Sequence, residues 1–267
     1  MKTRLDVTIF ERGLTPSREN ARALIMAGNV YVNGEKATKA GFPVTEADEI
    51  ELRGLPARYV SRGGFKLEKA LSVFSLDVSG LLCGDFGAST GGFTDCLLQN
   101  GARKVYAVDV GYGQLAWKLR TDDRVVCLER QNVRYVTEKE IPEKLDFFTV
   151  DVSFISLKTV LPAIFRLLAP GASGVCLIKP QFEAGRDKVG KHGVVRDIAV
   201  HEEVIASVVD FVRSSGYFPA GLSFSPITGP EGNIEFLLLI SSEDSGFEPQ
   251  VASVCRQAHE TLKAGKE

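Results

Sequence analysis

The sequence has few residues that bind metals or cross-link a chain. Its three histidines are scattered, and its five cysteines are widely spaced, with no C-x-x-C pair. An odd number of dispersed cysteines, three of them in apolar strand-like runs, predicts buried thiols in a reducing cytoplasm. It does not predict a disulfide set or a zinc site. We therefore expect a cytoplasmic protein whose site contains no metal.

Long apolar runs are also missing. The longest strongly apolar run is Phe236–Ile240, whereas a bilayer-spanning helix needs roughly 20 residues. Charges interrupt every apolar stretch near the N-terminus, so we expect no signal peptide. Lysine and arginine total 32 against 34 acidic residues, so net charge does not indicate a nucleic-acid binder, although a local basic surface is compatible with it. The composition, 44% hydrophobic and 25% charged, is typical of a globular chain of one large or two small domains.

The most informative stretch is Leu81–Thr94, LLCGDFGASTGGFT. An apolar run followed by glycines predicts a buried strand that enters a tight turn. Apolar residues at helical spacing follow from Phe93. Strand, glycine loop and helix in this order let a ligand approach the backbone N–H groups at the start of the helix.

The glycine pattern indicates which ligand is expected. The second glycine of a dinucleotide fingerprint is missing, and D-x-G-x-S-x-G-G resembles the first motif of S-adenosylmethionine-dependent methyltransferases. The next strand ends at Asp109, where an acid suits a ribose diol. The alternative is an ordinary α/β turn with a solvated aspartate. The expected cofactor-binding residues are Asp85, Gly87, Ala88, Ser89, Thr90, Gly91, Gly92, Asp109, Val110, Glu129, Asp151 and Phe154.

Downstream, strands alternate with helices, which predicts a mainly parallel sheet covered on both faces. The last two strands have no helix between them and predict an antiparallel hairpin at one edge. The expected strands cover 105–110, 125–129, 146–151, 174–180, 222–225 and 233–240, and the expected helices 93–99, 157–168, 202–214 and 249–263. A helix that opens near Ser61 should bury Phe65, Leu67, Leu71 and Phe74.

Residues 3–52 form a separate α+β unit by their pattern. Ser17 is a good N-cap for a helix that Gly28 ends, and Asn33-Gly34 after Val30–Val32 predicts a hairpin. The stretch resembles the S-four RNA-binding domain, named for the ribosomal protein. Seven basic residues outnumber four acidic ones in the first forty positions, which suits phosphate contacts. Solvated charges on a small module are the alternative interpretation.

Four polar residues complete the pattern. Ligands of such sheets lie beyond the carboxyl ends of the strands, which draws attention to Asp151 and Lys179. With Lys66 and Glu235 they resemble, in chain order, the Lys-Asp-Lys-Glu catalytic tetrad of FtsJ-like RNA 2′-O-methyltransferases. Lys69, one turn after Lys66, is a rival for its role. The resemblance implies that Lys179 accepts a proton from a ribose hydroxyl.

Together, these motifs are similar to those of the TlyA family, ribosomal RNA 2′-O-methyltransferases often labelled haemolysins. The resemblance implies a Rossmann-like class I methyltransferase sheet, S-adenosylmethionine as cofactor, and ribosomal RNA or ribosomal subunits as partners, with cytidine as the target. We expect an S-four-type domain at 1–55, a linker at 56–60, an FtsJ-like domain at 61–243 and a polar tail or helix at 244–267, in a monomer or weak dimer. The alternatives are a membrane-active haemolysin and a non-catalytic ribosome-assembly factor.

The basic, glycine-rich loop Gly185–Arg196 is expected to contact RNA, with a merely solvated loop as the alternative. The expected RNA-binding residues are Arg4, Arg18, Arg22, Lys36, Lys39, Arg62, Arg186, Lys188 and Lys191.

Overall fold

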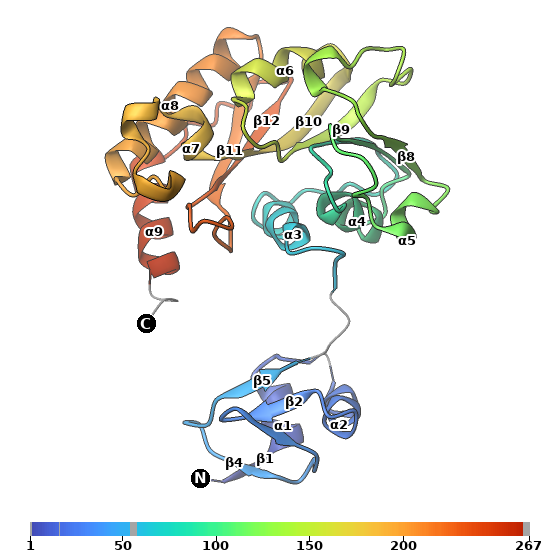
Figure 1. Cartoon of the computed structure of the whole chain (residues 1–267), viewed down its shortest axis with the longest axis vertical. Helices are drawn as coiled ribbons and strands as arrows, with labels where there is room; N and C mark the ends of the chain where they lie inside the picture. The colour runs from blue at the N-terminus through green and yellow to red at the C-terminus, as the bar shows by residue number, and fades with distance from the viewer. Residues whose placement is uncertain (1, 16, 54–57, 264–267) are drawn as a thin grey trace. The chain divides into compact units, whose positions relative to one another are not determined.

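The computed structural model describes residues 2–15, 17–53 and 58–263. The chain divides into two compact units, with the boundary between Arg58 and Tyr59 (Figure 1). Of the predicted linker, residues 56 and 57 lie outside the described residues. Tyr59 belongs to the second unit, where its side chain is buried.

The first unit pairs two helices with short strands. Helix α1 (Leu5–Glu11) packs against α2 (Arg18–Met26), and the Ser17 hydroxyl caps α2 by accepting a hydrogen bond from the Asn20 N–H at 3.1 Å. Strands β3 (Glu35–Ala37), β2 (Val30–Val32) and β5 (Ile50–Leu52) form an antiparallel sheet, and β1 (Thr3–Arg4) pairs with β4 (Pro43–Val44). The predicted N-cap and hairpin are confirmed.

The second unit is built on a seven-stranded sheet. Its order is β11-β12-β10-β9-β6-β7-β8. Five strands run parallel: β6 (Leu82–Phe86), β7 (Lys104–Val108), β8 (Val125–Leu128), β9 (Leu145–Val150) and β10 (Leu168–Ile178). Strand β12 (Phe236–Ser241) is antiparallel to both β10 and the edge strand β11 (Phe218–Phe224). The predicted parallel sheet with an antiparallel hairpin at one edge is confirmed.

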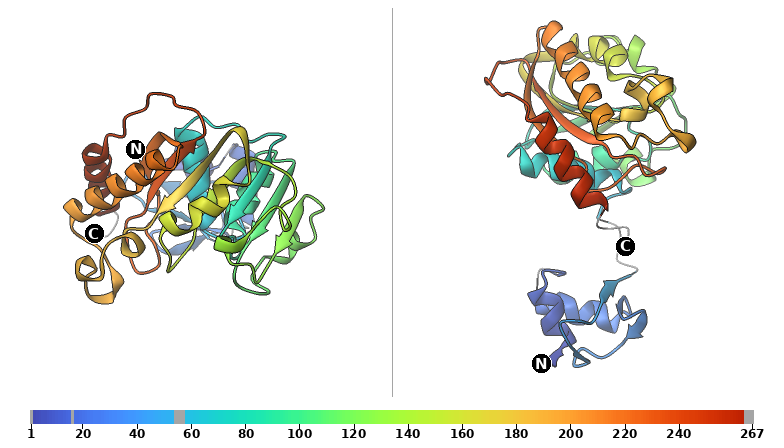
Figure 2. Two further views of the ribbon diagram at one scale, coloured as in Figure 1. Left: turned by 90° about the horizontal axis from the view of Figure 1, so that it is seen from above. Right: turned by 90° about the vertical axis from the view of Figure 1, so that its left-hand side faces the viewer.

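Helices cover both faces of this sheet (Figures 1 and 2). One apolar core lies under α3 (Gly63–Val73) and α4 (Gly92–Gln99), and another lies under α6 (Leu157–Phe165), α8 (Ile198–Ser214) and α9 (Val251–Lys263). Alternate residues of each strand serve the two cores; Tyr106 faces one and Val105 the other. The remaining short elements are α5 (Trp117–Arg120), α7 (Pro180–Glu183), η1 (Val133–Tyr135), η2 (Arg186–Lys188) and η3 (Lys191–Gly193).

Several predicted boundaries were wrong for local reasons. The helix predicted at 157–168 ends at Phe165, because Leu168 already pairs with Leu145 as the first residue of β10. Helix α8 begins at Ile198 instead of Glu202, since Asp197 caps the Ala199 N–H.

The last hairpin also differs from its predicted bounds. The predicted strand 233–240 begins later, at Phe236, because the Asn233 side-chain amide bonds the backbone of Val195 and Gly193 and not a neighbouring strand.

The buried face of α3 also differs from the prediction. Phe65, which was expected to be buried, is 39% exposed, whereas Lys66 and Leu67 are buried.

None of the five cysteines, all of which lie in the described part of the chain, forms a disulfide. Cys83, Cys96, Cys176 and Cys255 are buried as expected, whereas Cys127 is only half-buried. Burial raises the pKa of Cys83 to about 12, so this thiol stays protonated at neutral pH.

Candidate active site

The glycine loop 87–92 connects β6 to α4, as the sequence predicts. A side chain at Gly87, where φ is +90°, would come within 2.5 Å of the Asp151 carbonyl oxygen. Gly87 and Ala88 donate backbone hydrogen bonds to the Val108 carbonyl at the end of β7. Gly91 precedes α4 with φ at +98°. The loop is thus held against two strand ends, and glycine is required where it passes β9.

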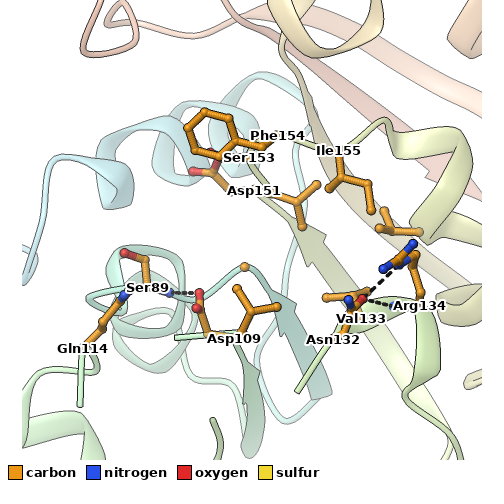
Figure 3. Close-up of a pocket in the computed structure, with 14 residues that line it drawn as sticks. Ser89, Asp109, Gln114, Asn132, Val133, Arg134, Asp151, Ser153, Phe154 and Ile155 are labelled. Carbon is orange, nitrogen blue, oxygen red and sulfur yellow. Dashed lines mark hydrogen bonds between the residues drawn. The ribbon is translucent and has the colours of Figure 1, made fainter. Parts of the chain in front are cut away.

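Asp109, directly after β7, connects this loop to the next one. One carboxylate oxygen accepts a hydrogen bond from the Ser89 N–H at 2.8 Å, and the other accepts one from the Gly111 N–H at 2.7 Å. The acid predicted at the end of the second strand therefore lies beside the glycine loop (Figure 3).

A first cavity of about 490 Å³ opens beside these residues. Ser89 and Asp109 lie on one side, and Val133 and Ile155 on the other (Figure 3). Six predicted cofactor residues line it: Gly87, Ser89, Asp109, Val110, Asp151 and Phe154. The sequence analysis missed other wall residues: Gln114, Asn132, Val133, Arg134, Val152, Ile155 and Val160. Asn132 could have been found, because it follows the end of a third strand at the same sheet edge.

A second cavity of about 340 Å³ shares Gly87, Ser89, Asp151 and Ser153 with the first. Ala88, Thr90 and Gly92 of the glycine loop line this second cavity, together with all four predicted tetrad residues. A third cavity, of about 480 Å³, shares Ser153, Lys179 and Glu235 with the second. The tetrad therefore lies at the junction of the cavities.

The four tetrad side chains form a chain of ion pairs. Lys179 Nζ lies 2.6 Å from Asp151 Oδ1, and Lys66 Nζ lies 3.7 Å from Asp151 Oδ2 and 2.6 Å from Glu235 Oε2. Lys179 Nζ also donates a hydrogen bond of 3.0 Å to the Ser153 hydroxyl. Each tetrad residue comes from a different part of the chain: α3, the end of β9, the end of β10 and the start of β12.

Three of the four tetrad residues are nearly dehydrated, whereas the Asp151 side chain is 19% exposed. Lys66 and Lys179 are each 8% exposed, and Glu235 is 1% exposed. Burial raises the pKa of Glu235, although the neighbouring Lys66 ammonium lowers it. Two lysines and two acids balance in formal charge, which is what buried ionic groups require.

Lys69 does not join the tetrad. Its ammonium lies over the Phe224 ring, 3.4 Å from the ring centroid, and burial lowers the pKa of this lysine. Of the two lysines that the sequence left as rivals, only Lys66 contacts Asp151 and Glu235 among the described residues.

Both units of the chain match known protein families. Residues 59–241 match the FtsJ-like methyltransferase family, and residues 3–50 match the S4 domain. The chain belongs to the TlyA family of FtsJ-like methyltransferases.

Individual relatives are similar over nearly their whole lengths. YqxC of Bacillus subtilis is 52% identical over 272 residues, covering 99% of this chain and 97% of the relative. The 16S/23S rRNA (cytidine-2′-O)-methyltransferase TlyA of Mycobacterium tuberculosis is 43% identical, covering 91% of each chain. A solved structure from Streptococcus thermophilus is 47% identical with a TM-score of 0.77, covering 99% of this chain and 98% of its own.

Three predicted cofactor residues, Asp85, Gly91 and Glu129, do not line the first or the second cavity. Gly91 faces the side chains of Leu115 and Leu119. Asp85 is fully buried, and its carboxylate accepts hydrogen bonds from the hydroxyls of Thr94 at 2.6 Å and Thr149 at 3.0 Å. Glu129 accepts hydrogen bonds from Arg120 and from the Gly113 N–H.

The predicted RNA-binding residues fall into separate groups. In the S4 domain, Arg4, Arg18 and Arg22 converge, while Lys36 and Lys39 are exposed. In the methyltransferase domain, Arg62 lines the second cavity, and Lys188 pairs with Glu203 at 2.6 Å. The backbone of Arg186 lies in η2 and that of Lys191 in η3.

Within residues 2–15, 17–53 and 58–263, no helix is both long and apolar enough to cross a membrane. The same ranges contain no group of three or more His, Cys, Asp or Glu side chains that could hold a metal ion.

Replacing Asp85 should change the pH dependence of stability without changing cofactor binding. Burial raises the pKa of Asp85 to about 6 from its ordinary 3.8, although the Thr94 and Thr149 hydroxyls lower it. Because the pKa of Asp85 is higher in the folded than in the unfolded state, proton binding at Asp85 stabilises the fold. This stabilisation is complete below pH 4 and is lost as the pH rises through 6. The free energy of unfolding of the unchanged protein, relative to Asp85→Asn, should fall by about 3 kcal/mol between pH 4 and pH 7.5.

Urea unfolding of both proteins across this pH range measures the difference. S-adenosylhomocysteine affinity, measured in parallel, should stay within a few-fold, since Asp85 does not line the cavity. A stability difference that does not vary with pH would contradict the buried, raised-pKa assignment.

Proposed function

We propose that this protein transfers a methyl group from S-adenosylmethionine to a ribose 2′-hydroxyl of ribosomal RNA, at a cytidine, in the cytoplasm. The observation that carries the proposal is the convergence of Lys66, Asp151, Lys179 and Glu235 where the cavities meet. The reaction named for the Mycobacterium tuberculosis relative supports the choice of cytidine and ribosomal RNA.

The first cavity fits S-adenosylmethionine by size and chemistry. Its volume of about 490 Å³ is in the range of pockets that bury a small ligand. Asp109 would accept hydrogen bonds from the ribose hydroxyls, while Val133, Ile155 and Val160 would contact the adenine ring. The bound cofactor supplies an electrophilic methyl group on a positively charged sulfur.

The tetrad residues would prepare the attacking hydroxyl. Lys179 would accept its proton, which an amine can do only as the free base. Asp151 and Ser153 hold the Lys179 nitrogen from two sides, so its position is fixed before substrate binds. Glu235 holds Lys66, which keeps a second positive charge beside Asp151.

The second and third cavities offer room for the target nucleotide next to Lys179. Arg62 at the second cavity would pair with a phosphate, and Phe182 in the third offers an aromatic surface to a base. The S4 domain would hold the surrounding RNA through its arginines, so that capture and chemistry are divided between the two domains.

Lys179 variants test the acid–base role. Lys179→Ala should lower the single-turnover rate of ribosomal RNA methylation by roughly 10²–10⁴, the usual contribution of a positioned acid or base. Lys179→Arg should be nearly as slow, because a guanidinium stays protonated. Lys69→Ala is the matched control and should leave the rate within about threefold. A near-normal Lys179→Arg rate would mean that the residue supplies charge alone.

Asp109 variants test the cofactor site. Asp109→Asn removes a charge-assisted hydrogen bond and should weaken S-adenosylhomocysteine binding by about 10- to 100-fold. Asp122→Asn changes a half-buried acid that pairs with Arg124 and does not line the cavity, so this variant should bind normally. Isothermal titration calorimetry measures both. The cofactor assignment fails if the unchanged protein prefers NAD to S-adenosylhomocysteine.

Membrane lysis, the alternative activity, has a direct test. Dye-loaded liposomes should stay intact at protein concentrations that saturate RNA methylation, because the proposed substrate is RNA. Dye release above that caused by an unrelated protein of similar charge would support the haemolysin alternative.

A further inference from the structure

Asp6 is a fully buried carboxylate in the S4 domain, surrounded by arginines. Its side chain is 0% exposed, whereas those of Arg4, Arg18 and Arg22 are 51%, 45% and 48% exposed. A charge is rarely buried unless its partners compensate it. Three half-exposed cations around one buried anion leave the outer surface of this group positive.

The fold brings the four side chains together from three elements. Asp6 lies in the first turn of α1, Arg4 is the last residue of β1, and Arg18 and Arg22 are one turn apart on α2. Residues four apart on a helix share one face, so both α2 arginines point to the same acid. Each of them donates its Nε–H to Asp6 Oδ2 at 2.9 Å. Arg4 donates its Nε–H to Oδ1 at 2.9 Å and an Nη2–H to Oδ2 at 3.3 Å.

The charges of this group do not cancel. Burial raises the pKa of Asp6, but hydrogen bonds from Arg4, Arg22 and Arg18 hold it well below its usual range, so the carboxylate stays ionised. One negative charge offsets one of three positive charges. Without it, the guanidinium groups would repel one another at this distance and separate.

The donors used by Asp6 leave others for a ligand. Arginine carries five N–H donors in a planar fork that matches phosphate geometry. Within residues 2–15, 17–53 and 58–263, no partner is recorded for the Nη groups of Arg18 and Arg22. These groups are therefore available at the half-exposed surface, at positions that Asp6 sets.

We propose that Asp6 is a positioning residue that gathers Arg4, Arg18 and Arg22 into one preformed phosphate-binding cluster for the RNA backbone. This inference rests on the proposed function. It adds that Asp6 acts on RNA binding through the three arginines, without touching the RNA itself. Because the side chains are ordered before binding, the RNA complex loses less side-chain freedom when it forms. The alternative is that Asp6 only clamps α1 to α2.

Charge-matched variants separate this role from simple electrostatics. Asp6→Asn and Glu19→Gln each remove one negative charge from the S4 domain, and Glu19 is an exposed residue of α2. Long-range electrostatics alone predicts that both variants bind RNA slightly more tightly. If Asp6 positions the arginines, Asp6→Asn should instead bind about tenfold more weakly, while Glu19→Gln should bind as tightly as the unchanged protein or better.

The measurement uses full-length protein and labelled 16S and 23S ribosomal RNA at a fixed salt concentration, well below the melting temperature of each variant. Weak binding by Asp6→Asn but not by Glu19→Gln supports the positioning role. Equal affinity of the two variants overturns it. If the unchanged protein itself fails to bind ribosomal RNA, the proposed function fails instead, so the two failures are distinguishable.

A second measurement keeps the proposal falsifiable if Asp6→Asn does not fold. In unchanged, RNA-free protein, NMR should show slow solvent exchange of the Nε–H protons of Arg4, Arg18 and Arg22. Arg12 is the internal control, because its bonds to the Thr45, Glu46 and Asp48 carbonyls use Nη1 and Nη2. If the Nε–H protons of these three arginines exchange as fast as that of Arg12, the cluster is not preformed and the proposal is overturned.

Discussion

Antiparallel pairing of β12 with β10 is the constraint on which the candidate active site depends. Parallel strands present their carboxyl ends at one edge of the sheet, and an antiparallel neighbour presents its amino end there. Ile178 is opposite Phe236, so Glu235, one residue before Phe236, reaches the edge where Lys179 leaves β10. If β12 ran parallel to β10, Glu235 would lie at the other end of the strands, away from both lysines.

The glycine loop 87–92 begins at the same edge of the sheet. Phe86 of β6 pairs with Val150 of β9, so the glycine loop and Asp151 begin at the same level of the sheet. Gly87 passes the Asp151 carbonyl so closely that no larger residue fits. The Asp151 backbone thus limits the path of the loop beside one cavity, while its side chain holds Lys179 beside another.

The sequence was sufficient to predict the order of the strands and the residues that lie at their ends. The glycine loop, Asp109, Asp151 and Lys179 could be predicted because each follows an apolar strand. Lys66 lies within helix α3, and only the resemblance to the FtsJ-like tetrad singled it out, together with Glu235. The sequence was insufficient where a side chain chooses among several partners. Asp85 also ends a strand, but it turns inward because the Thr94 and Thr149 hydroxyls lie within reach. Arg120 and the Gly113 N–H hold Glu129 in the same way, and no linear pattern encodes those contacts. Asn132 follows the third strand at the same end of the sheet, but it was missed because it lies beyond the predicted strand 125–129, where it caps the short helix η1.

Asp6 and Asp151 are both acids that contact several cations, but the cations differ in type. The cations around Asp6 are arginines, which cannot release a proton and whose planar groups keep fixed directions. Such a cluster can orient a phosphate but cannot catalyse proton transfer. The cations around Asp151 are lysines, which can become neutral amines, and they lie almost fully out of water. The difference in exposure suits the two proposed roles. A phosphate would have to reach the arginines from solvent, whereas a proton acceptor is more effective where water does not compete for the hydroxyl. In the proposed function, the residue type around each acid would therefore separate RNA capture from methyl transfer.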